Sequence, residues 1–186
     1  MPPVKLLAGA AALCLGAGVT GVAMAASGAS SHVTTIKAVT GPTVVKINRY
    51  IEDAVRWNKD VYHVKSGGTL RIVNDAAQDG PHTFTVVAAK DLPRTPAQVA
   101  NCQICATLAK AHGANPGSNT PPKFQYLDGG VGQNTPPSVD GPGDSGITGP
   151  GKPGESITLT VTAKPGTVLE FMCLIHPWMQ AKIIVK

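Results

Sequence analysis

Short stretches of alternating apolar and polar residues recur along the chain and predict β-strands. The clearest is Ser156 to Ala163, where Ile157, Leu159 and Val161 alternate with threonines. A period of two is typical of a strand with one buried and one solvent-facing side. Glycine- and proline-containing turns separate further expected strands at residues 43–48, 61–65, 69–73, 82–87, 167–172 and 181–185. The pattern predicts an all-β fold, an antiparallel β-sandwich of Greek-key type.

A long insertion interrupts the strand pattern and begins with the features of a helix start. Thr95 suits an N-cap, Pro96 suits the first helical position, and the Gln98 side chain can reach back to the cap. Gly113 supplies a stop signal. We therefore expect one inserted helix from Pro96 to His112.

The insertion as a whole covers about residues 89–154, and its second part has a different composition. Residues 114–154 are dense in Gly, Pro, Asn and Ser and poor in apolar residues. Such a segment buries too little surface to offset its ordering entropy. A long, largely irregular Gly/Pro-rich loop is expected here, held to the sandwich at Phe124, Tyr126 and Leu127.

Residues 1–25 have the features of a secretory signal peptide. Lys5 is the only charge, an Ala/Leu/Gly/Val-rich stretch follows, and Ala23-Met24-Ala25 offers the small residues that a signal peptidase reads. A retained membrane anchor is the alternative, but the Gly/Ala-rich composition and the processing pattern favour cleavage after Ala25. Residues 26–186 would then form a single domain in the periplasm or outside the cell.

Near the C-terminus, a thiol, an imidazole and a thioether fall within seven positions, in Cys173-Leu-Ile-His176-Pro-Trp-Met179. With one more imidazole, these are the ligand types of a type 1 copper centre. His82 is the expected second imidazole, because it lies where a Gly-Pro turn meets a predicted strand. The plainer alternatives are a buried structural thiol at Cys173 and a core methionine at Met179.

Three other histidines compete with His82. His63 lies inside a predicted strand and suits either face, His32 lies near the mature terminus, and His112 ends the predicted helix. At that position a histidine can interact with the negative end of the helix dipole. None of the three follows a proline-containing turn into a strand, so His82 is favoured.

These motifs resemble those of the cupredoxins, small type 1 blue copper proteins of the plastocyanin, pseudoazurin and amicyanin type. The resemblance covers roughly residues 43–88 and 155–186, with one Pro-His in mid-chain and a C-terminal Cys-x-x-His-x-x-Met loop. The short spacing after the loop histidine is closest to the amicyanin loop. The resemblance implies one copper ion held by four ligands, His82, Cys173, His176 and Met179.

The resemblance also implies a function, the transfer of single electrons between redox partners by cycling between Cu(I) and Cu(II). In similar proteins the loop histidine is the electron's exit, so His176, with Pro177 and Trp178 beside it, is the expected docking patch for a transient protein partner. A copper-binding protein for copper transfer or storage is the alternative. Copper enzymes of related fold need further histidine clusters, and this chain has five histidines and no His-x-His pair. We expect a monomer that is not an enzyme.

One departure from the family pattern concerns the residue after the first histidine. The family usually has Asn there, hydrogen-bonded near the cysteine loop, whereas this chain has Thr83. Hydrogen bonds around the ligands tune a metal site that the ligands themselves define. An altered reduction potential is therefore expected, with the site retained.

Three cysteines follow residue 25, so at least one of them cannot be in a disulfide within the chain and needs another role. Metal ligation by Cys173 would leave Cys102 and Cys105 to form a structural disulfide in an oxidising compartment. Covalent c-type haem lacks its histidine, since Ala106 follows the motif, and a thioredoxin-like motif lacks its βαβ context. A second copper or zinc site that includes His112 remains an alternative.

Charge adds little to this picture. Loss of Lys5 with the signal lowers the formal net charge from +5 to +4. The lysines and arginines are dispersed, so nucleic-acid binding has no support, and a mildly basic protein favours an acidic redox partner.

Overall fold

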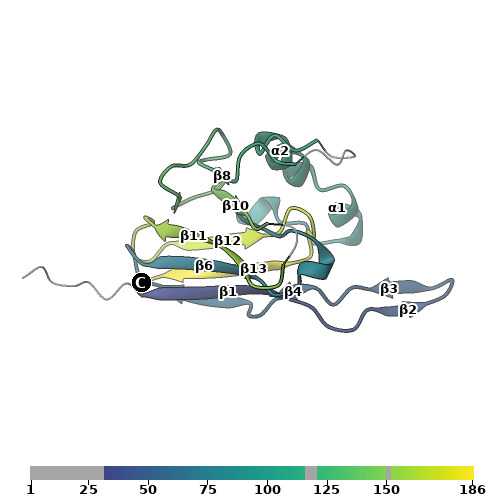
Figure 1. Cartoon of the computed structure of the whole chain (residues 1–186). Coiled ribbons are helices and arrows are strands. Elements are labelled where there is room, and N and C mark those ends of the chain that lie inside the picture. The colour runs from purple at the N-terminus through teal and green to yellow at the C-terminus, as the bar shows by residue number, and fades with distance from the viewer. Residues whose placement is uncertain (1–31, 116–120, 150–151) are drawn as a thin grey trace, which may run out of the picture. The chain divides into compact units, whose positions relative to one another are not determined.

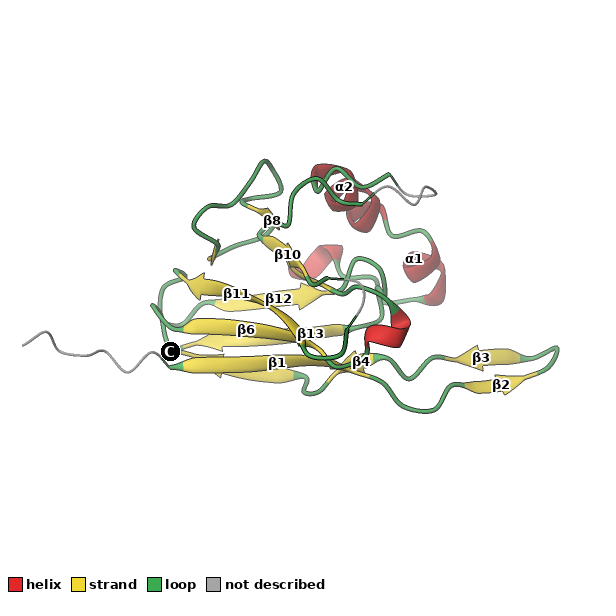
Figure 2. Ribbon diagram, in the orientation of Figure 1, coloured by secondary structure: helices red, strands yellow, loops and turns green. Residues whose placement is uncertain are grey.

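The computed structural model describes residues 32–115, 121–149 and 152–186, and the expected signal peptide lies outside these ranges. The described strands form two main sheets that face each other (Figures 1 and 2). One sheet has the order β4-β1-β6-β11-β9, and the other has the order β5-β13-β12-β7-β10-β8. The strands are β1 (Val33–Val39), β4 (Arg56–Trp57), β5 (Val61–Val64), β6 (Thr69–Asn74), β7 (Thr83–Val87), β8 (Tyr126–Leu127), β9 (Ser138–Val139), β10 (Ser145–Ile147), β11 (Glu155–Val161), β12 (Val168–Met172) and β13 (Gln180–Val185).

The core lies between the two sheets and follows the predicted alternation. In β11 the apolar residues Ile157, Leu159 and Val161 are buried, while the intervening threonines are exposed. Phe171 and Phe84 both belong to the facing sheet, and their rings pack against each other in the core with centroids 4.7 Å apart. Burial of these side chains is the main stabilising contribution to such a sandwich. The predicted all-β sandwich class is confirmed.

The strands are not all antiparallel, which corrects the sequence-based expectation. Strand β1 pairs with β6 in parallel, as do β13 with β5 and β11 with β9. Parallel neighbours require connections that cross to the other sheet and return, and local alternation contains no information about such connections. The antiparallel pairs β12–β13 and β7–β12 remain at the centre of the second sheet.

The predicted single helix is two helices, α1 (Pro96–Ala100) and α2 (Gln103–Ala111). The capping box of Thr95 and Gln98 is present at the start of α1. The break occurs because the Asn101 side chain donates to the Ala97 carbonyl and ends α1, after which Cys102 caps α2 through its sulfur. Short 3-10 turns also flank β7, at Ala77–Asp79 and Ala89–Asp91.

The Gly/Pro-rich segment after α2 is more ordered than the sequence predicts. It contains β8, β9 and β10, and β10 pairs with β7 of the main sheet. Gly146 lets β10 pack closely on the other sheet, because a Cβ atom there would lie 2.5 Å from the Ile157 side chain of β11. Among the expected anchors, Leu127 is fully buried and Tyr126 packs against the core.

A separate hairpin of β2 (Val44–Lys46) and β3 (Tyr50–Glu52) projects beyond the ends of β1 and β4 (Figure 1). Its apolar side chains Val45 and Ile51 face each other across the hairpin and are exposed. Across the described ranges, no helix has the length and apolar character needed to cross a membrane.

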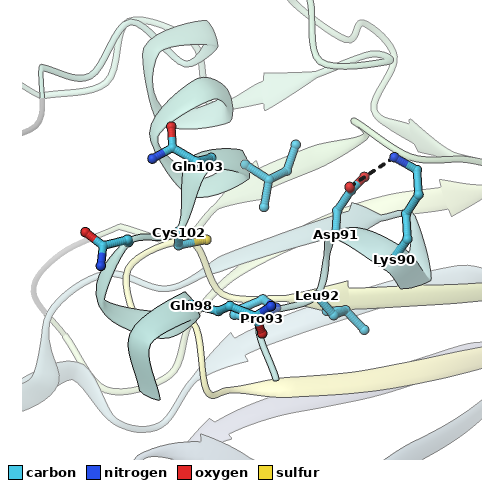
Figure 3. A pocket seen from close by; sticks show the side chains of 9 residues that line it. Lys90, Asp91, Leu92, Pro93, Gln98, Cys102 and Gln103 are labelled. Carbon is cyan, nitrogen blue, oxygen red and sulfur yellow. Dashed lines mark hydrogen bonds and ion pairs between the residues drawn. The ribbon is translucent and has the colours of Figure 1, made fainter. Parts of the chain in front are cut away.

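The disulfide end of the insertion packs onto the sandwich. Figure 3 shows a hollow between Cys102 at the start of α2 and the Leu92–Pro93 segment, with the Lys90–Asp91 ion pair at its edge. Beneath it, Leu92 and Cys105 lie in a small apolar cluster with Leu174. The insertion thus contacts the loop that follows β12.

Candidate metal centre

His82 is placed by a turn that the sequence specifies closely. The chain leaves β6 at Asn74, whose side chain donates to the Gly80 carbonyl and accepts from the Ala76 N–H. Gly80 has φ +93°, which a residue with a Cβ rarely adopts. Thr148, after β10, then fixes the His82 backbone, since its hydroxyl accepts from the His82 N–H at 3.0 Å. His82 therefore enters β7 with its ring fully buried.

The loop between β12 and β13 is closed by its own backbone. The Cys173 N–H donates to the Met179 carbonyl at 3.0 Å, and the Met179 N–H donates to the His176 carbonyl at 2.8 Å. The Gln180 side chain donates to the Pro177 carbonyl. Because β12 runs antiparallel to β7, the end of β12 lies beside the start of β7. Cys173 and His82 meet there although they are 91 residues apart.

The structure brings His82, Cys173 and His176 together. The Cys173 Sγ lies 3.9 Å from His82 Nδ1 and 3.8 Å from His176 Nδ1. Ligand bonds of about 2.1 Å to nitrogen and about 2.3 Å to sulfur, at 120°, would separate N and S by roughly 3.8 Å. The spacing therefore suits a metal ion bound between the three atoms, and two imidazoles with one thiolate fit a type 1 copper ion.

Met179 is joined to this cluster through its backbone, which bonds to Cys173 and His176. It is almost fully buried and belongs to the same core cluster as Cys173. Its carbonyl accepts from the indole N–H of Trp57 at 3.0 Å. The backbone at Met179 is thus anchored to the first sheet, and the role of its thioether as a ligand stays a prediction.

Burial sets the protonation of the metal-free site. Burial lowers the pKa of His82, and the nearby His176 ring lowers it further. Burial also lowers the pKa of His176. Burial raises the pKa of the Cys173 thiol, and hydrogen bonds from Thr83 oppose this rise. Neutral imidazoles are ready to bind a metal, whereas the thiol releases its proton on binding. The second nitrogen of His82, Nε2, lies 3.4 Å from the Ala76 carbonyl, which orients the ring.

Thr83, the departure from the family pattern, links the two ligand segments. Its backbone N–H donates to the Cys173 sulfur at 3.4 Å, and its hydroxyl accepts from the Leu174 N–H at 2.7 Å. A threonine therefore provides a hydrogen bond beside the cysteine loop. Its effect on the reduction potential stays a prediction.

The other candidate residues have separate places. His32 and His63 are exposed, and His112 is buried in a different hydrogen-bonding network, where its Nε2 lies 2.8 Å from the Ser145 hydroxyl. Cys102 and Cys105 form the expected disulfide. This motif therefore has no free thiol for a second metal site.

The surface beside His176 differs in part from the expected docking patch. Trp178 is 43% exposed, but Pro177 is buried, and its carbonyl accepts a hydrogen bond from the Gln180 side chain. Ile175, which is not part of the expected patch, is 46% exposed. The exposed apolar residues that flank His176 are thus Ile175 and Trp178. No local pattern distinguished Ile175 from the buried Leu174 beside it.

Comparisons with protein-family models and with curated proteins find no match. Among solved structures, the chain is similar to auracyanin A, a blue copper protein from the green thermophilic photosynthetic bacterium Chloroflexus aurantiacus. The TM-score is 0.44 and the identity 15%, over 83% of this chain and 98% of that one. Auracyanin B gives 0.45 and 14%, over 83% and 88%, and a reduced Cu(I) form of an amicyanin mutant gives 0.39 and 12%, over 83% and 82%.

These identities and scores are low, so the case for copper rests on the side chains of the site. Two sheets pack around one core, and a buried His-Cys-His cluster lies where β7 begins and β12 ends. This fold and this cluster are what the resemblance to cupredoxins leads us to expect.

Proposed function

We propose that this protein is a single-electron carrier in which His82, Cys173, His176 and Met179 would hold one type 1 copper ion. The observation that carries the proposal is the convergence of two imidazole nitrogens on one buried thiol. When bound, copper would supply one-electron chemistry by alternating between Cu(I) and Cu(II). No bond of a substrate is made or broken, so the protein is not an enzyme.

An electron carrier needs ligands that move little when the charge of the metal changes, and the surroundings of the loop support this. Indole N–H groups hold it at two points, from Trp57 to the Met179 carbonyl and from Trp178 to the Val55 carbonyl. The Gln180 side chain donates to the Pro93 and Pro177 carbonyls. The loop is therefore bonded to the first sheet, to itself and to the segment before α1.

The surface around His176 supports a transient protein partner. Ile175 and Trp178 give a small exposed apolar area, and Trp178 borders a hollow that Pro93, Arg94 and Val99 also line. Small contact areas suit fast release between redox partners. The exposed Arg94 at this rim, with a formal charge of +4 after signal removal, favours a partner with an acidic face.

We place the protein in the periplasm or outside the cell. The Cys102–Cys105 disulfide supports this location, because disulfides persist in oxidising compartments. The signal-like sequence of residues 1–25 is the second support.

The first experiment adds Cu(II) to the purified protein and records visible and electron-spin-resonance spectra before and after reduction. We expect an intense visible band with type 1 hyperfine coupling that bleaches reversibly. Cys173→Ser should abolish the band, while the double variant Cys102→Ser/Cys105→Ser, which alters the two cysteines outside the His-Cys-His cluster, should keep it. A Cys173→Ser protein as coloured as the wild type would refute the assignment.

The same experiment tests the alternative of copper transfer or storage. That function predicts a colourless protein that binds Cu(I), exchanges electrons slowly and releases the metal readily to a chelator. Reversible colour with fast electron exchange would exclude it.

A further inference from the structure

The insertion places a buried histidine at one end of a chain of hydroxyl groups that reaches the metal centre. His112 follows α2 and is fully buried. Its Nδ1 lies 2.7 Å from the Phe124 carbonyl, and its Nε2 lies 2.8 Å from the hydroxyl of Ser145 in β10. Neither His112 nor Ser145 belongs to the proposed copper ligands, so the electron-carrier function leaves this pair unexplained.

Three buried hydroxyl groups continue from His112 toward the cysteine loop. The Ser145 Oγ lies 2.6 Å from the Thr85 Oγ1, which lies 3.2 Å from the Thr83 Oγ1. The Thr83 oxygen accepts from the Leu174 N–H, and the Thr83 side chain is also a hydrogen-bonding neighbour of Cys173. All three hydroxyl residues are at most 2% exposed. Because water does not reach them, these hydroxyl groups donate their protons to one another and to their buried neighbours.

The number of protons fixes how the chain can be arranged. The Phe124 carbonyl only accepts, so in the neutral ring Nδ1 carries the proton, and burial lowers the pKa of His112, which favours this form. Nε2 then accepts the Ser145 proton, and the Ser145 oxygen is left to accept from Thr85. Thr85 has one proton for two acceptors, Ser145 at 2.6 Å and Thr83 at 3.2 Å, and the shorter contact takes it.

We propose that His112 is a positioning residue for the metal centre, acting through Ser145 and Thr85. By holding the Ser145 proton it draws the Thr85 proton away from Thr83. The Thr83 hydroxyl then has a single donor, Leu174 N–H, on its oxygen, which limits how strongly it donates to the Cys173 sulfur. The effect on the reduction potential of copper rests on the proposed function, whereas the arrangement of the hydroxyl protons does not.

Removal of His112 should reverse this arrangement. Ser145 would donate to Thr85, and Thr85 would donate to Thr83. A hydroxyl that accepts more donors is itself a stronger donor, so the hydrogen bond to the Cys173 sulfur would strengthen. That bond withdraws electron density from the thiolate and favours Cu(I) over Cu(II), which raises the reduction potential.

The test compares His112→Leu and Ser145→Ala with the wild type, because both changes free the Thr85 proton for Thr83. In the copper-loaded proteins we expect both variants to raise the reduction potential. In the metal-free proteins we expect the Leu174 amide proton to move upfield in NMR spectra, because it then shares the Thr83 oxygen with a second donor. If His112→Leu fails to fold, Ser145→Ala decides alone.

Thr85→Val separates the hydroxyl chain from a general loosening of the insertion. Valine is nearly isosteric with threonine but has no hydroxyl proton to donate to Thr83. The rise in potential and the Leu174 amide shift should therefore both vanish when His112→Leu or Ser145→Ala is combined with Thr85→Val. Leu108→Ala is the matched control, since Leu108 is buried in the same small apolar cluster as Leu92, Cys105 and Leu174 but is not part of the row of hydroxyl groups. It should loosen the packing without raising the potential.

Three outcomes would overturn the proposal: wild-type potentials and amide shifts in both single variants, effects that persist beside Thr85→Val, or an equal rise in Leu108→Ala. If the wild type takes up no copper, the proposed function fails. The Leu174 amide shift in the metal-free protein then still decides whether His112 acts through the chain.

Discussion

Acidifying the metal-free protein from about pH 7.5 to about pH 5.5 is expected to lower its free energy of unfolding by up to about 4 kcal/mol. His82, His112 and His176 are buried, and burial lowers the pKa of each below the ordinary value of 6.5. As the pH falls through that value, the unfolded chain takes up protons that the folded protein refuses. Stability is therefore fully present above pH 6.5 and is lost below it.

The magnitude follows from linkage. One histidine that stays neutral in the folded state lowers the free energy of unfolding by about 1.4 kcal/mol over this pH range. Three such residues lower it by about 4 kcal/mol. Asp53 and Asp79 act in the opposite direction on His82 and His176, so the sum is an upper value. Such a loss is a large part of the roughly 5–15 kcal/mol that stabilises a typical domain.

Urea denaturation of the metal-free protein at several pH values in this range measures the effect. Ordinary carboxylates titrate near pH 4 and contribute little here. His176→Gln, which removes one titrating group from the site, should reduce the loss by at most about 1.4 kcal/mol. A stability that stays constant to within about 0.5 kcal/mol across the range would show that the buried rings do not resist protonation, and the reasoning would fail.

Three further predictions concern packing and hydrogen bonding, each measured by thermal or urea unfolding. Thr83→Val should destabilise the metal-free protein by about 1–3 kcal/mol, because the buried Leu174 N–H loses its acceptor; an unchanged midpoint would contradict this. Phe171→Ala should cost about 3–5 kcal/mol, since it empties the centre of the aromatic core, and a loss below about 1 kcal/mol would contradict it. Gly143→Ala should destabilise by at least about 1 kcal/mol, because φ is +99° and its Cβ would clash with the Gly129 backbone; wild-type stability would disprove the close contact.

The parts of the site that the sequence predicts well are those with local signals. Cys173 and His176 share one short loop, and the turn before His82 ends in Gly80 and Pro81. The strands with clean alternation, such as β11, were likewise predictable, because one face of each meets the core.

The remainder depends on contacts between distant segments. His112 and Ser145 are 33 residues apart, and Ser145 and Thr85 are 60 apart, so no spacing rule connects them. Strand β10 is short, and Ser145 and Gly146 have little strand propensity. It becomes a strand because β7 offers a partner, which is a tertiary effect that composition hides.

The two indole anchors of the metal loop also make this protein its own optical probe. The chain contains two tryptophans, and both lie beside the cluster: the Trp57 ring is 6.5 Å from the His82 ring, and the Trp178 ring is 5.3 Å from the His176 ring. Trp57 is 3% exposed and Trp178 is 43% exposed, so their fluorescence should differ in colour. A metal that quenches at such short range would dim both emitters at once. Ultraviolet-excited emission therefore follows the filling of the site without any label, and Trp178→Phe would leave the buried emitter alone to report on it.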